Sequence, residues 1–507
     1  MLRNVVLIGL LAAAIPAAHV TADGPSANLL ANARWQYSDD AGSTWTGLPP
    51  RLTGSTNATF HARTTFTAAT GDGNATLVLT TGDESGQEAS FRLNGSDLPL
   101  PLAGMHYHEI QAPATGLRSG DNRLEVIIRY QGGLANSVPL ALPTKLTVQS
   151  ADGLKIVTGP VLGSAGEDFF TVTCRTNMPA RVTLSAKADV TSSPSGLFHR
   201  LRVPAANKPE RYVLTVRPAA AAEPVIREQV DRPLFPTAGL RFAVCGDSRS
   251  NPPAWKNVAD AMAATRPHLA VHTGDLVRHG LSDWQWNEQF FDPAARLTRA
   301  VPFFAVLGNH DTDAPIFDEM IYNPKRKPDP HWQQEINGVL LIGIDGAKDF
   351  SASSPSARWL EETLAASKAR FIFLFTHYPA WTSGAHGELG KDGRPKLRYQ
   401  RDAQDVIIPL LVRHKATALF AGHDHFYERS ELPGISHVIT AAAGASQRRK
   451  GPEAGKQNPY SKVFASKLHY CLVEVAGDTA VMTARTPGGE VIDRCTWKAR
   501  TPSGSVK

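Results

Sequence analysis

Hydrophobic and polar positions follow two different patterns along this chain. Up to about residue 218, short alternating runs are separated by turn sequences such as Asn94-Gly95. Alternation with a period of two turns one face of each strand toward a core, and closely spaced turns are typical of β-sandwiches. We predict a jelly-roll-like sandwich over residues 23–152, for carbohydrate binding or as a spacer, and a fibronectin- or immunoglobulin-like sandwich over residues 153–218.

The pattern changes after an alanine- and proline-rich linker at residues 219–236. From residue 237 to 500, continuous apolar runs alternate with amphipathic stretches. This rhythm is typical of a layered α/β domain, here a β-sandwich flanked by helices with much parallel sheet. The expected strands are Arg241–Cys245, Leu269–His272, Phe303–Val306, Val339–Ile344, Arg370–Phe375, Ala416–Phe420 and His437–Thr440, and the expected helices are Trp255–Thr265, Trp284–Leu297, Ser356–Ser367 and Ala403–His414.

Polar clusters follow five of these apolar runs. Because open α/β sheets bind ligands at the carboxyl ends of their strands, we expect the clusters to converge. Carboxylate, amide and imidazole side chains together suit first-row divalent metals, singly or as a pair. The clusters are Gly246-Asp247, Gly274-Asp275, Gly308-Asn309-His310-Asp311, Thr376-His377 and Gly422-His423-Asp424-His425.

The order of these clusters resembles the calcineurin-like metallophosphoesterase superfamily. The segment from His423 to Arg429, and the position of His386 nine residues after His377, are similar to the purple acid phosphatase-like branch. A small β-sandwich ahead of the catalytic domain also fits that branch. The resemblance covers roughly residues 154–498 and implies hydrolysis of phosphate esters by a metal-activated water.

The resemblance also implies a ligand set for one or two transition metals, such as Fe, Zn or Mn in divalent or mixed-valence form. Two such ions would clamp an in-line phosphoryl displacement and lower the pKa of a bridging water. The implied ligands are Asp275 as the bridge, Asn309, His377 and His423 on one ion, and Asp247 and His425 on the other.

Further residues are candidates for contact with the substrate. His310 would face the leaving-group oxygen as a general acid, with Asp311 holding its tautomer. His386 is a second candidate, with a surface loop histidine as the alternative. His272 stands three residues before Asp275 in an extended strand, which places it on the opposite face, in the core.

Two arginines depart from the family pattern. Arg249 stands where many members have a histidine, two residues after the first aspartate. Arg278 stands where purple acid phosphatases have a tyrosine ligand, three residues after Asp275. Arginine has no lone pair for a metal, but its planar guanidinium binds phosphate oxygens. We therefore expect at least one of them to supply positive charge at a depleted first metal site, and the protein to be colourless.

These observations predict a phosphomonoesterase of the acid phosphatase type that acts on a small phosphate ester. A phosphodiesterase or nucleotidase on the same metal core is the enzymatic alternative, because the core does not choose between esters. A third alternative is a glycan- or surface-binding protein with a partly degenerate phosphoesterase domain. The intact Asn309-His310-Asp311 motif argues against degeneration.

The N-terminus and the charge distribution bear on location and partners. Residues 1–22 combine Arg3, an apolar run and a small-x-small ending, as in a signal peptide, so we expect a secreted or periplasmic protein with no later transmembrane segment. The net charge of +6 is spread along the chain, without a nucleic-acid-binding footprint. Arg448-Arg449-Lys450 is interpreted first as a solvated loop and second as a rim that attracts anions.

The chain has four cysteines. Cys174 and Cys245 lie in apolar strand-like runs and are expected to be buried thiols. Cys471 and Cys495 lie in two C-terminal strands and are candidates for a disulfide, which export permits without requiring.

Overall fold

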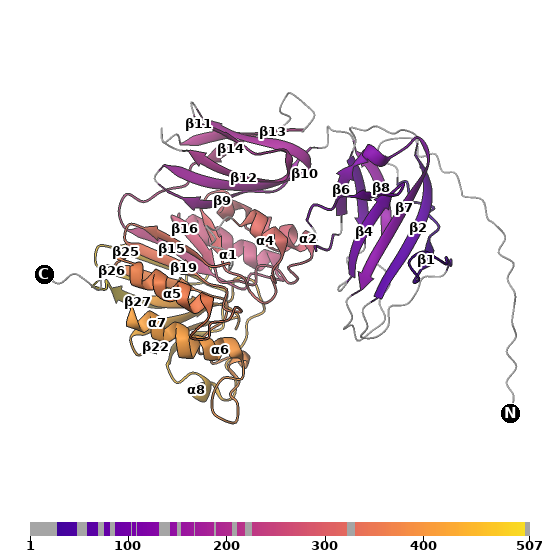
Figure 1. The fold of residues 1–507 in the computed structure, drawn as a ribbon. Coiled ribbons are helices and arrows are strands. Elements are labelled where there is room, and N and C mark those ends of the chain that lie inside the picture. Colours follow the sequence, from indigo (N-terminus) through magenta and orange to yellow (C-terminus); the bar gives the residue numbers. More distant parts are fainter. Residues whose placement is uncertain are drawn as a thin grey trace, which may run out of the picture. The chain divides into compact units, whose positions relative to one another are not determined.

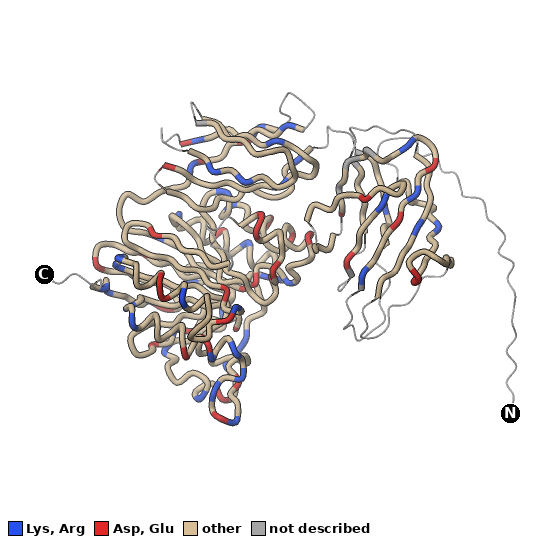
Figure 2. The backbone as a smooth tube through the Cα atoms, in the orientation of Figure 1, with Lys and Arg blue, Asp and Glu red and all other residues tan. Residues whose placement is uncertain are grey.

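The computed structural model divides the chain into two compact units (Figure 1). Unit 1 comprises Met1–Pro101 and Tyr107–Gly153, and unit 2 comprises Leu102–His106 and Leu154–Lys507. Lys and Arg are interspersed with Asp and Glu in both units (Figure 2). The structure describes residues 28–47, 58–68, 76–81, 87–102, 104–107, 109–130, 142–149, 154–166, 168–186, 189–204, 210–218, 226–321 and 330–501.

Unit 1 contains two antiparallel sheets, one five-stranded in the order β1-β2-β7-β4-β5 and one three-stranded in the order β6-β3-β8. Leu124, Val126 and Ile128 alternate along β7 and are completely buried, as the period of two predicts. The carbohydrate-binding role expected for this unit stays a prediction. The elements are β1 Gln36–Ser38, β2 Ala58–Ala68, β3 Thr76–Thr81, β4 Gln87–Leu93, β5 Ser96–Leu98, β6 Glu109–Pro113, η1 Ala114–Gly116, β7 Gly120–Tyr130 and β8 Pro143–Gln149.

Unit 2 begins with a six-stranded antiparallel sheet built around the long strand β10, Phe169–Ala186. An irregularity between Arg175 and Ala180 shifts the register in which β10 pairs with β12. Cys174 on β10 is completely buried, as expected. The other strands are β9 Ile156–Ala165, β11 Asp189–Ser192, β12 Gly196–Pro204, β13 Arg211–Pro218 and β14 Ile226–Asp231.

This sheet is attached to the rest of unit 2 by polar contacts. Arg175 Nη1 donates to Asp283 Oδ1 over 2.5 Å, and both side chains are nearly buried. Thr173 Oγ1 donates to the carbonyl oxygen of Met320 over 2.6 Å. Removing one partner of a buried ion pair leaves an uncompensated charge, so the Arg175 contact holds the sheet in place. The predicted boundary at residue 152 stays a prediction. The linker predicted at residues 219–236 is corrected, because β14 lies within it and pairs with β13, so the sheet extends to Asp231.

The remainder of unit 2 is built on two sheets that face each other. One has the order β17-β16-β15-β25-β26-β27 and the other β18-β19-β20-β21-β23-β22-β24. Strands β15 to β17 are parallel, as are β19, β20, β21 and β23, which confirms the expected parallel sheet. The strands are β15 Leu240–Cys245, β16 Leu269–His272, β17 Phe303–Ala305, β18 Trp332–Ile336, β19 Val339–Gly343, β20 Phe371–Phe375, β21 Ala418–Ala421, β22 Tyr427–Leu432, β23 Ile435–Thr440, β24 Ser461–Ala465, β25 Tyr470–Ala476, β26 Thr479–Arg485 and β27 Val491–Lys498.

The core between the two sheets is aromatic. Phe242 of β15 meets Phe373 of β20 edge-to-face with ring centroids 5.1 Å apart. Phe375 and Phe420 stack in the same buried cluster. Burying each such side chain stabilises the fold by roughly 1.5–3 kcal/mol, so the contact between the sheets is strong.

Helices cover the outer faces of both sheets (Figure 1). Trp255 of α1 packs against His272 and Phe290 over one sheet, which confirms that His272 belongs to the core. Leu360 of α5 and Leu411 of α7 pack over the other sheet. The helices are α1 Pro252–Ala264, α2 Asp283–Gln285, η3 Trp286–Phe291, α3 Ala295–Thr298, α4 Pro315–Met320, α5 Pro355–Ala366, η4 Ala385–Gly387, α6 Arg398–Asp402, η5 Ala403–Ile407, α7 Ile408–Arg413 and α8 Ala454–Gln457.

Two expectations are corrected here. The single helix expected over Trp284–Leu297 is divided into α2, η3 and α3. α2 and η3 are continuous, and the interruption before α3 contains Pro293, which has no N–H to donate a helical hydrogen bond. The possible disulfide is absent, since all four cysteines are free. Cys471 and Cys495 lie on β25 and β27, which flank β26, and strands two apart are separated by about 10 Å, too far for a disulfide.

Two predictions concern the signal peptide and membrane-spanning helices. The expected signal peptide, residues 1–22, lies outside the described residues. Within the part of the chain that the structure describes, no helix has the length and apolar character needed to cross a membrane.

Candidate metal centre

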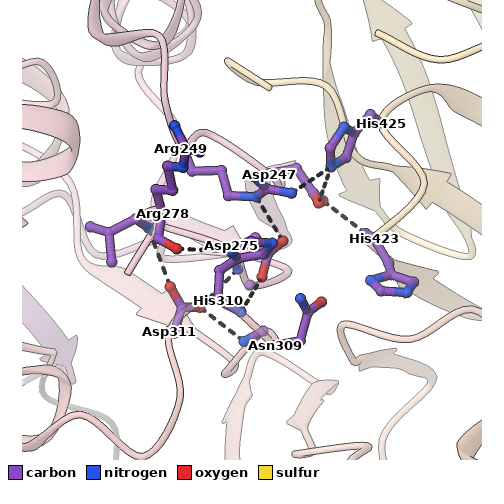
Figure 3. Close-up of polar contacts among 12 residues, drawn as sticks. Asp247, Arg249, Asp275, Arg278, Asn309, His310, Asp311, His423 and His425 are labelled. Carbon is purple, nitrogen blue, oxygen red and sulfur yellow. Dashed lines mark hydrogen bonds and ion pairs between the residues drawn. The ribbon is translucent and has the colours of Figure 1, made fainter. Parts of the chain in front are cut away.

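The polar clusters come together at the carboxyl ends of strands from both sheets (Figure 3). Asp247, Asp275 and Asn309 follow β15, β16 and β17 of one sheet. His377 follows β20 of the other sheet, and the segment that ends at His425 follows β21. The centre therefore lies across the seam between the two sheets, and neither sheet alone contains it.

The backbone around the centre is tightly packed. A Cβ at Gly308 would lie 2.3 Å from Asp275 Oδ1, and a Cβ at Gly422 would lie 2.8 Å from Asp247 Oδ2, so both positions require glycine. Asp247 and Asp275 have φ angles of 57° and 60°, and His425 has 53°. Such left-handed conformations cost roughly 1–3 kcal/mol each and persist only where the surrounding structure imposes them. The candidate ligands are thus held in preset positions.

We call Asp275, Asn309, His377 and His423 the second half-site. His377 Nε2 lies at its centre, 3.1 Å from Asn309 Oδ1, 3.1 Å from His423 Nδ1 and 3.5 Å from Asp275 Oδ1. His377 Nδ1 donates to the carbonyl oxygen of Thr273 over 2.9 Å, so the lone pair is on Nε2. The four candidate ligand atoms therefore point toward one another.

We call Asp247, Asp275 and His425 the first half-site; atoms of all three lie within 4.8 Å of one another. His425 Nδ1 contacts the carbonyl oxygen of Ser446 at 3.0 Å and therefore donates, which leaves the lone pair on Nε2. Arg249 occupies this half-site as well. Its Nε lies 3.0 Å from Asp275 Oδ2, and its Nη2 lies 3.2 Å from His425 Nε2 (Figure 3).

The two half-sites differ in how well their acceptor atoms are arranged to bind a metal cation. In the second, Asn309 Oδ1 and His377 Nε2 are both acceptors, and 3.1 Å is the spacing of neighbouring ligands around one ion with bonds of about 2.1 Å. The two acceptor atoms repel each other at this distance, and a cation bound between them would attract both. In the first, Asp247 Oδ1 has no hydrogen-bond partner among the described residues, but Arg249 already occupies two of the three ligands.

The protonation states agree with metal binding at the second half-site. Burial lowers the pKa of His377 and lowers that of His423 well below its usual value, so both imidazoles are neutral. Burial alone would raise the pKa of Asp275, but the charge of Arg249 and the hydrogen bond from the His310 N–H help to lower it below its usual value. Burial and the charge of Asp275 raise the pKa of Asp247 well above its usual value. Metal ligands must be deprotonated, and the second half-site meets that condition.

His310 stands at the open side of the centre. Its N–H donates to Asp275 Oδ1 over 3.0 Å, and its Nδ1 donates to the carbonyl oxygen of Arg278 over 2.8 Å. The expectation that Asp311 holds the tautomer of His310 is wrong. The Asp311 carboxylate is buried and accepts backbone N–H groups instead, including those of Asp275 and Gly308. Burial and the charge of Asp275 raise the pKa of Asp311 to about 7.

Other side chains surround His423. His386 stacks on it with ring centroids 3.9 Å apart, and His386 Nδ1 lies 2.9 Å from Asp424 Oδ1. Arg448 Nη1 lies 3.2 Å from the ring nitrogens of His386, so this arginine is part of the site wall. The Tyr399 hydroxyl lies 3.3 Å from His423 Nε2. Sequence reasoning missed Tyr399, which carries no motif, and interpreted Arg448 first as a solvated charge.

The two unusual arginines take different places. The Arg249 side chain is only 15% exposed and points into the first half-site. Arg278 is exposed, and the part of it that serves the centre is its carbonyl oxygen, which holds His310. Of the two, Arg249 is the one that brings a positive charge among the candidate ligands.

Comparison with known proteins agrees with this geometry. The family model described as calcineurin-like phosphoesterase matches residues 240–427, which contain every residue of both half-sites. Tartrate-resistant acid phosphatase type 5 of Mus musculus is 25% identical over 252 residues, covering 41% of this chain and 73% of that protein. The corresponding protein of Homo sapiens is 24% identical over 270 residues, covering 44% and 79%.

The catalytic part of unit 2 is a metallophosphoesterase of the purple acid phosphatase-like branch. It hydrolyses phosphoric esters in a metal-dependent reaction. The fold of this phosphoesterase is shared with purple acid phosphatase PPD1 from yellow lupin seeds, with a TM-score of 0.58 at 13% identity, covering 87% of this chain and 93% of that one. PhoD, with a TM-score of 0.50 at 11% identity, covers 70% of this chain and 94% of its own.

Proposed function

We propose that this phosphoesterase is a phosphomonoesterase that acts on small, soluble phosphate esters. The observation that carries the proposal is the set of positive and proton-carrying groups around the centre: Arg249, Arg448, His310 and His386. A monoester dianion carries one more charge than a diester and gains more from such a set. The positive charge around the centre is therefore the reason to expect a preference for monoesters over diesters.

Each residue has a role in the proposal. A cation bound in the second half-site would supply Lewis-acid stabilisation of the phosphoryl oxygens and activate the attacking water. Asp275, Asn309, His377 and His423 would hold it, with Asp275 shared with the first half-site. His310, oriented by the Arg278 carbonyl, keeps its Nε2 for a proton that it gives to the leaving oxygen.

The experiment compares p-nitrophenyl phosphate with bis(p-nitrophenyl) phosphate on the full chain loaded with Mn²⁺. We expect a larger kcat/KM for the monoester. A larger kcat/KM for the diester would contradict the proposal and favour a phosphodiesterase. No hydrolysis of either ester by metal-loaded protein would instead favour a binding protein with a degenerate site.

Two further proposals rest on sequence alone. Residues 1–22 would direct export, so the protein would be secreted or periplasmic; mass spectrometry of the N-terminus of protein isolated from its native cells tests this. Unit 1 would bind a glycan, and retention on immobilised polysaccharides by the full chain but not by a chain without unit 1 tests that.

A further inference from the structure

We propose that the guanidinium of Arg249 permanently takes the place of a cation in the first half-site, so that the enzyme works with a single metal ion in the second half-site. The proposal deepens the proposed function and rests on it. It assigns Arg249 as the fixed positive partner of that ion.

The first observation is the direction of the Arg249 hydrogen bonds. Its Nε lies 3.0 Å from Asp275 Oδ2 and its Nη2 lies 3.2 Å from His425 Nε2. His425 Nδ1 donates to the carbonyl oxygen of Ser446, so the lone pair that accepts from Arg249 is the one a metal would need. Arg249 therefore competes with a metal for two of the three candidate ligands.

The second observation is how firmly Arg249 is held. Its backbone N–H points to the carbonyl oxygen of Asp275 over 3.4 Å, and its side chain is 15% exposed. Asp275 is 1% exposed, so the pair is screened from water. Moving the guanidinium away would leave a buried carboxylate without its partner, which is strongly unfavourable.

The third observation is the balance of charge. One divalent ion and one guanidinium bring three positive charges, whereas the carboxyl groups of Asp247 and Asp275 bring at most two negative charges. The remaining positive charge suits an incoming phosphate. A second divalent ion would have to enter next to a guanidinium whose charge repels it.

The experiment measures how many Mn²⁺ ions the full chain binds, by equilibrium dialysis with elemental analysis, and whether they are magnetically coupled, by electron paramagnetic resonance. We expect the unaltered protein to bind one Mn²⁺ with the spectrum of an isolated ion. Arg249→Ala should bind two, with the spectrum of a coupled pair. Arg278→Ala is the matched control, because it removes an exposed arginine from the same region, and it should bind one.

Two Mn²⁺ in the unaltered protein, or one in Arg249→Ala, would overturn the proposal. Arg249→Ser serves as a second variant if the alanine variant does not fold, with the same expected result. No Mn²⁺ in any variant, together with no hydrolysis, would instead overturn the proposed function itself. The number of bound ions therefore separates the failure of this inference from the failure of the enzyme assignment.

Discussion

The two half-sites of the metal centre share Asp275 but differ in what their other members face. In the second half-site, the acceptors His377 Nε2 and Asn309 Oδ1 lie 3.1 Å apart, and His423 Nδ1 lies 3.1 Å from His377 Nε2. In the first, the lone pair of His425 Nε2 already accepts from Arg249. Similar residue types at the strand ends of one fold can therefore present acceptor atoms suited to a metal ion in one place and contact a protein cation in the other.

Replacing the shared carboxylate should have the largest effect. Asp275→Asn removes the charge that belongs to both half-sites, so we expect metal content and hydrolysis to fall to background. Asp247→Asn changes a candidate ligand of the first half-site alone and keeps an oxygen that can accept from the His423 N–H, so it should keep the metal of the second. Elemental analysis and p-nitrophenyl phosphate hydrolysis measure both variants. Equal metal loss in the two variants would contradict the division into half-sites.

Replacing His310 tests whether chemistry and metal binding are separate. His310→Ala should lower kcat by ~10²–10⁴, the usual range for loss of general acid–base catalysis, with unchanged metal content. His279→Ala, an exposed histidine of the neighbouring loop, is the control and should keep its kcat. Loss of metal in His310→Ala would show that this histidine supports the second half-site.

Acid should destabilise the fold that holds both half-sites. Burial lowers the pKa of His437 to about 3 and that of His469 to about 4, so both are neutral in the folded chain and protonated in the unfolded chain between pH 4 and 6.5. Their contribution is complete above pH 6.5 and is lost as the pH falls, by up to roughly 2–3 kcal/mol each at pH 4.5. Urea unfolding at pH 7.5 and 4.5 in EDTA, which removes the metal contribution, measures this. Equal stability at both pH values would contradict it.

Removing unit 1 should have the smallest effect. A chain that begins at Leu154 loses Leu102–His106, which belongs to unit 2. In that segment, the His106 N–H donates to the Leu281 carbonyl over 2.7 Å, and the His106 carbonyl accepts from the Asp283 N–H over 2.8 Å. Two backbone hydrogen bonds contribute roughly 1–3 kcal/mol, so we expect a lower Tm with retained hydrolysis of small esters. Complete loss of hydrolysis would show that this segment is needed to orient the loop that holds His310.

Much of the fold and the convergence of the candidate ligands could be predicted from the sequence because the signals are local. The apolar runs and the glycines before Asp247, Asp275 and His423 are read from neighbouring positions. The strands β15, β16 and β20 and the residues after them appear where the pattern predicts them.

The remainder depends on contacts between distant segments. Asp311 follows His310 directly, yet its carboxylate bonds to backbone groups of another loop. Arg448 approaches His386 from 62 residues away, which no local pattern records. Leu102–His106 joins unit 2 through backbone hydrogen bonds, which do not depend on the identity of the side chains. The sequence therefore identifies candidate functional residues but does not predict which of them contact one another in the folded chain.

The position of the centre across the seam of two sheets has a thermodynamic consequence. A metal ion that binds residues from both sheets is held only while the two sheets are packed against each other. Its binding free energy therefore depends on the free energy of the contact between the sheets. Phe242 and Phe373, which are not candidate ligands, would then influence the dissociation constant of the metal. A substitution that loosens the packing of the aromatic core would therefore be expected to lower the metal affinity of this protein.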